Sequence, residues 1–195
     1  LAQSSAEQGL KILRDFIHFY PRSKDGREPY PTALRLINMV KFCCQNSLND
    51  SQVNSLIYSD AQNLLYHLEY HLLANHLLED GFGLLFAGIY LQEEAIVKKA
   101  SHIILSELKE QFQEDGLHYE QSPMYHSILL ERILDSIALL RAYDGPKGLL
   151  KALEKTAEKS LSFLDWCTLE DYFPLWNDAA LGIAKKPSQI SNSGS

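Results

Sequence analysis

The chain has 195 residues, of which 46% are hydrophobic and 22% are charged, and its net charge at neutral pH is −7. A chain of this length can bury enough apolar surface to form a substantial core. The acidic balance, together with the lack of any run of Lys or Arg, argues against a nucleic-acid partner, because phosphate backbones are bound by concentrated basic surfaces. Net charge does not exclude an acidic polysaccharide, which a local basic cleft can bind.

Neither a disulfide framework nor a membrane segment is expected. The chain has three cysteines, two of them adjacent (Cys43 and Cys44), and this number and spacing do not suggest a set of disulfides. No stretch approaches the roughly 18–20 consecutive apolar residues that a membrane span needs. The sequence begins at Leu1 without a secretory signal and ends in a Ser-rich stretch from Ser191, which suggests a piece of a longer polypeptide.

Apolar residues recur at helical spacing through nearly the whole sequence. The predicted helices lie at about 10–20, 33–46, 51–64, 66–91, 93–113, 123–140 and 146–167. Pro21 ends the first of them, the run Asn49-Asp50-Ser51 offers N-cap oxygens for the third, and Ser122 followed by Pro123 starts the sixth. The helix at 66–91 contains three glycines, which either allow close helix packing or mark a bend. An irregular segment rich in aromatic residues follows Cys167.

Six or seven helices joined by short connections, with no strand-like alternation, predict an all-α fold of antiparallel helical hairpins. Periodicity alone is compatible with a bundle, a solenoid or part of an α/α toroid.

Four segments contain polar and aromatic residues that a helical core does not need. They are Glu-Pro-Tyr-Pro-Thr at 28–32, the stretch 69–76 ending in Asn75-His76, the stretch 118–126 containing Ser-Pro-Met-Tyr-His, and Pro-Leu-Trp-Asn-Asp-Ala-Ala at 174–180. Each lies at a predicted helix end or in a loop, where binding residues tend to concentrate.

In this order, the four segments resemble the N-terminal helical domain of the heparinase II/III-like polysaccharide lyases, a family that includes alginate lyases. The resemblance covers about residues 26–187, and Asn75-His76 and the run 122–126 are its most specific parts. It implies an incomplete α/α toroid over residues 1–187, a disordered tail or linker at 188–195, and a following β-sandwich domain. The implied reaction is β-elimination at a uronic acid of an acidic polysaccharide or oligosaccharide.

The resemblance assigns the chemistry to three residues. Removal of the C5 proton puts negative charge on the neighbouring carboxylate, which hydrogen-bond donors must neutralise. Asn75 and His76 match the family's pair for this role. Tyr125 matches the family's catalytic tyrosine, which acts as a general acid or base. Without the resemblance, Asn75 and His76 are better explained as a buried polar pair that backbone carbonyls satisfy in a helix kink, and Tyr125 as a core or rim tyrosine with its hydroxyl hydrogen-bonded.

Five further residues are expected to bind substrate: His118, Glu120, His126, Trp176 and Asn177. Structural hydrogen bonding is an equally good explanation for Glu120 and His126. Trp176, Asn177 and Asp178 either line the cleft or pack the last loop onto the helices.

No metal and no other cofactor are predicted. His67 and His71 have the spacing of two metal ligands on one helix face. Glu69 is displaced by one position from the His-Glu-x-x-His pattern, however, and spacing suggests no third ligand.

Two other functions remain open: a glycan-binding module without chemistry, and a helical scaffold for protein interaction. The resemblance implies that further catalytic groups come from the β-sandwich domain, so the isolated chain is expected to be inactive. Exposure of the apolar surface that this domain would cover favours a homodimer of the isolated chain. A periplasmic or secreted location is implied by the resemblance alone.

Overall fold

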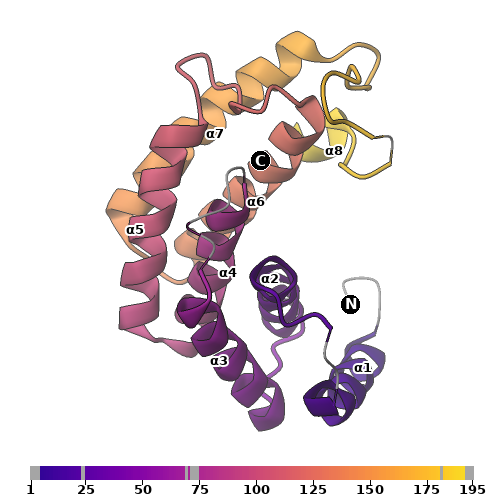
Figure 1. Cartoon of the computed structure of the whole chain (residues 1–195), viewed down its shortest axis with the longest axis vertical. Coiled ribbons are helices and arrows are strands. Elements are labelled where there is room, and N and C mark those ends of the chain that lie inside the picture. Colours follow the sequence, from indigo (N-terminus) through magenta and orange to yellow (C-terminus); the bar gives the residue numbers. More distant parts are fainter. Residues whose placement is uncertain (1–4, 23–24, 69, 71–74, 181, 192–195) are drawn as a thin grey trace. The chain divides into compact units, whose positions relative to one another are not determined.

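The computed structural model describes residues 5–22, 25–68, 70, 75–180 and 182–191, and within these residues the fold is all-α, as predicted. The helices are α1 (Ala6–Phe19), the 3-10 turn η1 (Tyr20–Arg22), α2 (Pro29–Gln45), α3 (Ser51–Tyr66), α4 (His76–Leu91), α5 (Glu94–Gln111), α6 (Pro123–Ala142), α7 (Lys147–Cys167) and α8 (Pro187–Ser191) (Figure 1). None of the described helices is long and apolar enough to cross a membrane.

The chain divides into two compact units, residues 1–101 and 102–195. The sequence predicted one domain over residues 1–187, arranged as part of an α/α toroid. Both the single domain and the toroid stay predictions.

Among the helix boundaries that differ from those predicted, two concern the sequence motifs. Helix α2 begins at Pro29 and so includes the Pro-Tyr-Pro run, which the sequence placed before the helix. Proline is well suited to a first helical turn, because the N–H that it lacks has no partner inside the helix. Helix α3 ends at Tyr66 and α4 begins only at His76, so the predicted helix at 66–91 starts ten residues late.

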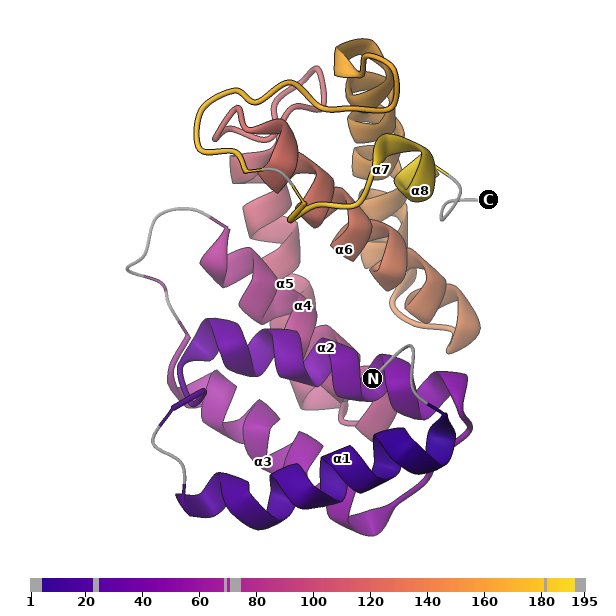
Figure 2. The same cartoon turned by 90° about the vertical axis from the view of Figure 1, so that its right-hand side faces the viewer.

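The first unit has α4 at the centre of its packing. Helix α2 contacts both α4 and α3, and α3 also contacts α4 and α1 (Figure 2). Every residue of α4 from Leu77 to Gly88 is buried, as expected for a helix that is apolar on nearly all faces. Phe42 of α2 and Phe82 of α4 are the largest fully buried side chains.

The glycines of α4 allow close packing and do not break the helix. A Cβ atom at Gly83 would lie 2.7 Å from the Cα of Ala33 in α2, and Ala33 itself is completely buried. The backbones of α2 and α4 therefore approach one another too closely for a larger residue at position 83. At Gly83 the structure therefore favours close helix packing, one of the two alternatives that the sequence left open.

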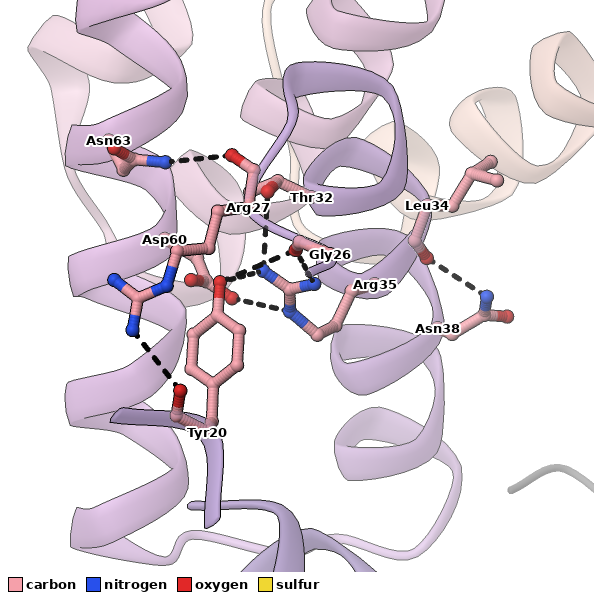
Figure 3. A network of polar contacts seen from close by, with 9 residues as sticks. All are labelled: Tyr20, Gly26, Arg27, Thr32, Leu34, Arg35, Asn38, Asp60 and Asn63. Carbon is pink, nitrogen blue, oxygen red and sulfur yellow. Dashed lines mark hydrogen bonds and ion pairs between the residues drawn. The ribbon is translucent and has the colours of Figure 1, made fainter. Parts of the chain in front are cut away.

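A partly buried cation, Arg35, fixes the connection between α1 and α2 (Figure 3). Arg35 Nε lies 2.8 Å from Asp60 Oδ2 in α3. Its other nitrogens donate to the Tyr20 hydroxyl at 2.7 Å, to Gly26 O at 2.8 Å and to Thr32 Oγ1 at 3.2 Å. With the charge paired and most of its donors satisfied, Arg35 joins α2, α3 and the turn before α2 without leaving a buried polar group unpaired.

In the second unit α6 packs against α7, and α8 contacts both. Residues 188–191 belong to α8, and the disordered tail or linker expected at 188–195 stays a prediction. Ile190 is 1% exposed, and Asp171 accepts hydrogen bonds from the Ser188 backbone N–H at 2.8 Å and hydroxyl at 2.9 Å. Apolar burial and a capped first turn hold this short helix in place; residues 192–195 lie outside the described chain.

Candidate functional site

The Asn75-His76 pair lies at the beginning of α4 in the first unit. Asn75 is the N-cap residue and is 5% exposed, but its side chain makes no capping hydrogen bond to the helix. His76 is half-buried, and its ring lies 4.9 Å from the ring of Tyr30, centroid to centroid. Tyr30 belongs to the 28–32 segment, so two of the four sequence motifs meet here. The pair lies at the start of helix α4.

Tyr125 lies in the first turn of α6 in the second unit. Ser122 is the N-cap of this helix, and its hydroxyl accepts the Tyr125 backbone N–H at 3.4 Å. The half-buried Tyr125 side chain donates its hydroxyl hydrogen to Asp178 Oδ2 at 3.2 Å. Because the cap fixes the backbone and Asp178 engages the hydroxyl, the phenol is positioned at both ends.

The 174–180 segment is fastened to the start of α6 by several hydrogen bonds. The Asn177 amide donates to Gln121 O at 2.9 Å and to Glu120 O at 3.3 Å. The Ser122 hydroxyl donates to Asp178 O at 3.0 Å. Gln121 and Asn177 both have positive φ, at 54° and 52°, so two tight turns face one another. The third and fourth sequence motifs therefore form one cluster.

The surroundings of Tyr125 favour its protonated form. Partial burial raises the pKa of the phenol, and the Asp178 carboxylate raises it further by its charge and by accepting the hydroxyl hydrogen. Glu120 adds a smaller effect in the same direction. A tyrosine held in this way is better suited to donate a proton than to remove one.

His118 and His126 are completely buried. His126 Nε2 lies 3.0 Å from Ser160 O, and the His118 backbone N–H donates to His126 Nδ1 at 3.4 Å. His118 Nε2 lies 2.9 Å from Gln111 Oε1. These contacts tie the 112–122 connection to α6 and α7. The expectation that both histidines contact substrate is not supported by this burial, which favours structural hydrogen bonding.

The other predicted binding residues differ in accessibility. Trp176 is 48% exposed, and Asn177 is exposed although its amide is engaged by the protein. Glu120 is half-buried. Trp176 is thus accessible to a sugar ring, whereas Asn177 has the packing role that the sequence left as its alternative.

No group of three or more metal-ligating side chains occurs within the described residues. His67 Nδ1 lies 2.9 Å from Asn63 O, and His71 is outside the described part of the chain.

The family model for the heparinase II/III N-terminus matches residues 33–192. The chain belongs to this family. A solved structure titled heparinase III, the BT4657 gene product with methylated lysines, is similar with a TM-score of 0.58 and 20% sequence identity, over 78% of this chain. The chain spans a quarter of that structure's length (25%). None of the curated proteins matches.

The sequence placed Asp178 either in the cleft or in the packing of the last loop, but it did not pair this residue with Tyr125. The pairing could not be predicted, because Tyr125 lies 53 positions away in the sequence. The sequence signal that could have indicated this pairing was the presence of both the 118–126 and the 174–180 motifs in one chain. The structure brings Tyr125 to Asp178 and His76 to Tyr30; the joint action of Asn75, His76 and Tyr125 stays a prediction.

Proposed function

We propose that this chain is the helical part of a polysaccharide lyase that cleaves uronic-acid-containing glycans by β-elimination. The observation that carries the proposal is the Tyr125–Asp178 hydrogen bond at the start of α6, which holds a partly accessible phenol in its protonated form. Membership of the heparinase II/III family supports the reaction class.

In the proposed reaction Asn75 and His76 bind the uronate carboxylate. Their position at the first turn of α4 suits this role, because backbone N–H groups and the helix dipole favour an anion at a helix N-terminus. The Asn75 side chain is not used as a cap, so its amide donors do not serve the helix. As the C5 proton leaves, charge grows on the carboxylate and these donors stabilise it.

Tyr125 acts as the general acid in this scheme. The C5–H electrons form the C4=C5 double bond, the bond from C4 to O4 breaks, and Tyr125 donates its proton to the departing oxygen. Asp178 orients the hydroxyl and keeps it protonated until that step. We propose that the base which takes the C5 proton belongs to a further domain of the full-length protein, and that this chain is inactive without it.

The test uses the full-length protein that contains this chain and a panel of acidic polysaccharides. Each elimination creates an unsaturated uronate, which absorbs in the ultraviolet. Tyr125→Phe removes only the hydroxyl and should reduce the rate by about 10²–10⁴-fold. Tyr143→Phe makes the same change at the other end of α6, where the tyrosine is 49% exposed, and should have no effect.

Full activity of Tyr125→Phe would refute the role of this residue. Oligosaccharide binding without any turnover, in the full-length protein with its fold intact, would instead favour the glycan-binding module.

A further inference from the structure

A pocket in the second unit adjoins the Tyr125 cluster. Its volume is about 330 Å³, and it is lined by Met124 and by residues 171–175, 179–180, 182 and 184–187. Small-molecule sites have volumes of about 300–1,000 Å³. Met124 directly precedes Tyr125, Ala179 directly follows Asp178, and the Ala180 backbone N–H donates to Met124 Sδ at 3.3 Å. The pocket and the phenol therefore share the same backbone segments.

The lining combines an apolar surface with one available cation. Three charged residues line the pocket, and two of them are engaged. Lys185 Nζ lies 2.8 Å from Glu131 Oε1, and the Asp171 carboxylate accepts two hydrogen bonds from Ser188. Lys186 Nζ lies 5.1 Å from the centroid of the Tyr172 ring. Hydrogen bonds from Ser188 lower the pKa of Asp171, and the charge of Lys186 adds a smaller effect in the same direction. An exposed ammonium above an aromatic ring can exchange this weak contact for an anion.

Tyr172 provides the second recognition element. It is 60% exposed and also lines the pocket. An aromatic face packs against the apolar C–H face of a pyranose, while a carboxylate or sulfate on the same sugar requires a cation. A lysine over an exposed aromatic ring can therefore bind both the ring face and the anionic group of an acidic sugar. A neutral sugar has no anionic group for the ammonium to bind.

We propose that this pocket binds an acidic sugar residue of the substrate next to the one that reacts at Tyr125, with Lys186 contacting its anionic group and Tyr172 its ring face. This assignment rests on the proposed lyase function, because it takes Tyr125 to be the place where the substrate reacts. It adds to that function a selectivity for glycans that have negative charge on adjacent sugars.

Binding to this chain tests the assignment directly, because all the lining residues belong to the second unit. The probes are an unsulfated uronic-acid tetrasaccharide, a sulfated one and a neutral glucose tetrasaccharide, measured by calorimetry and by chemical shifts. Lys186→Gln should weaken binding of the charged probes roughly threefold to tenfold. Lys151→Gln removes an equal charge from an exposed position on α7 outside the pocket and should change binding less than twofold.

Tyr172→Phe keeps the ring and should bind like the unmodified chain, whereas Tyr172→Ala should lose most of the affinity for both charged probes. Equal binding of the neutral probe, or equal losses in Lys186→Gln and Lys151→Gln, would overturn the assignment. A preference for one charged probe identifies the anionic group as carboxylate or sulfate.

The lyase proposal and the pocket assignment can fail separately. Tyr125→Phe keeps its ring, so the chain should still bind the charged tetrasaccharides while the full-length protein loses turnover. Lys186-dependent binding combined with an active Tyr125→Phe protein would refute the proposed role of Tyr125 and leave the pocket assigned. Loss of turnover in Tyr125→Phe without Lys186-dependent binding would refute the pocket alone.

Discussion

The two buried histidines of the second unit predict a marked loss of stability in mild acid. Burial lowers the pKa of His118 and of His126 from 6.5 to about 4. His118 is also affected by the neighbouring His126. The contacts explain the direction: His126 Nδ1 already accepts a backbone N–H, and His118 Nδ1 has no acceptor within the described residues. A proton on either Nδ1 would therefore be buried without a hydrogen-bond acceptor.

The sign follows from proton linkage. Unfolded histidines have a pKa near 6.5 and take up protons before the folded ones do, so between pH 6.5 and about 4 the unfolded state binds more protons. The stability that the folded state has with both histidines neutral is fully present above pH 6.5, and it is lost as the pH falls toward 4. At pH 5 the loss is about 2 kcal/mol for each histidine, from 1.36 kcal/mol per pKa unit over 1.5 units. The free energy of unfolding of a domain is about 5–15 kcal/mol. The loss from the two histidines together is therefore a large part of the total stability.

Urea unfolding followed by circular dichroism at pH 7, 6 and 5 measures this effect. The unmodified chain should lose about 3–4 kcal/mol over that range. Burial raises the pKa of Glu107, so that carboxyl opposes the trend but does not reverse it. His126→Gln keeps an amide that can donate to Ser160 O and should reduce the pH dependence by about half. His102→Gln, at an exposed position, should leave it unchanged. An unmodified chain with equal stability at pH 7 and pH 5 would refute the reasoning.

Three shorter predictions test other contacts. Gly83→Ala should lower stability by about 1–3 kcal/mol in thermal unfolding, because the new methyl group meets a helix backbone; Gly148→Ala, where a Cβ has open space, should be neutral or slightly stabilising. Asp60→Asn removes the carboxylate of the buried ion pair and should cost about 3 kcal/mol in urea unfolding; a loss below 0.5 kcal/mol would contradict that view of the pair. Asp178→Asn should lower the pKa of Tyr125, which an NMR titration of ring resonances measures; an unchanged titration would argue against the hydrogen bond.

The helices could be predicted because their signals are local. Asp50 caps α3 through the backbone N–H groups of Gln52 and Val53, and Ser122 caps α6, as the sequence indicated. The gap between α3 and α4 could not be predicted, because residue types compatible with a helix continue from His67 to Asn75. Only tertiary contacts decide where such a segment stops being helical.

The sequence could predict which segments form the candidate site, but it could not predict which side chains contact one another there. Nothing local links Tyr125 to Asp178, because the connection depends on how residues 174–180 fold back onto the start of α6. Histidine is common both in binding sites and in polar interiors, so the sequence could not show that His118 and His126 are buried. The family resemblance identified the important segments, and the structure separates accessible side chains from those that hold the segments together.

The first turns of α4 and α6, where the sequence motifs lie, differ in whether the N-cap side chain accepts a hydrogen bond from a backbone N–H group. At α6 the Ser122 hydroxyl takes a first-turn N–H and also binds the Asp178 carbonyl, so this helix end is committed to positioning Tyr125. At α4 the Asn75 side chain makes no capping hydrogen bond to the first turn. A capped terminus gains nothing from an added anion at the same N–H, whereas an uncapped one does. This difference is why we assign carboxylate binding to α4 and proton donation to α6 in the proposed reaction, and not the reverse.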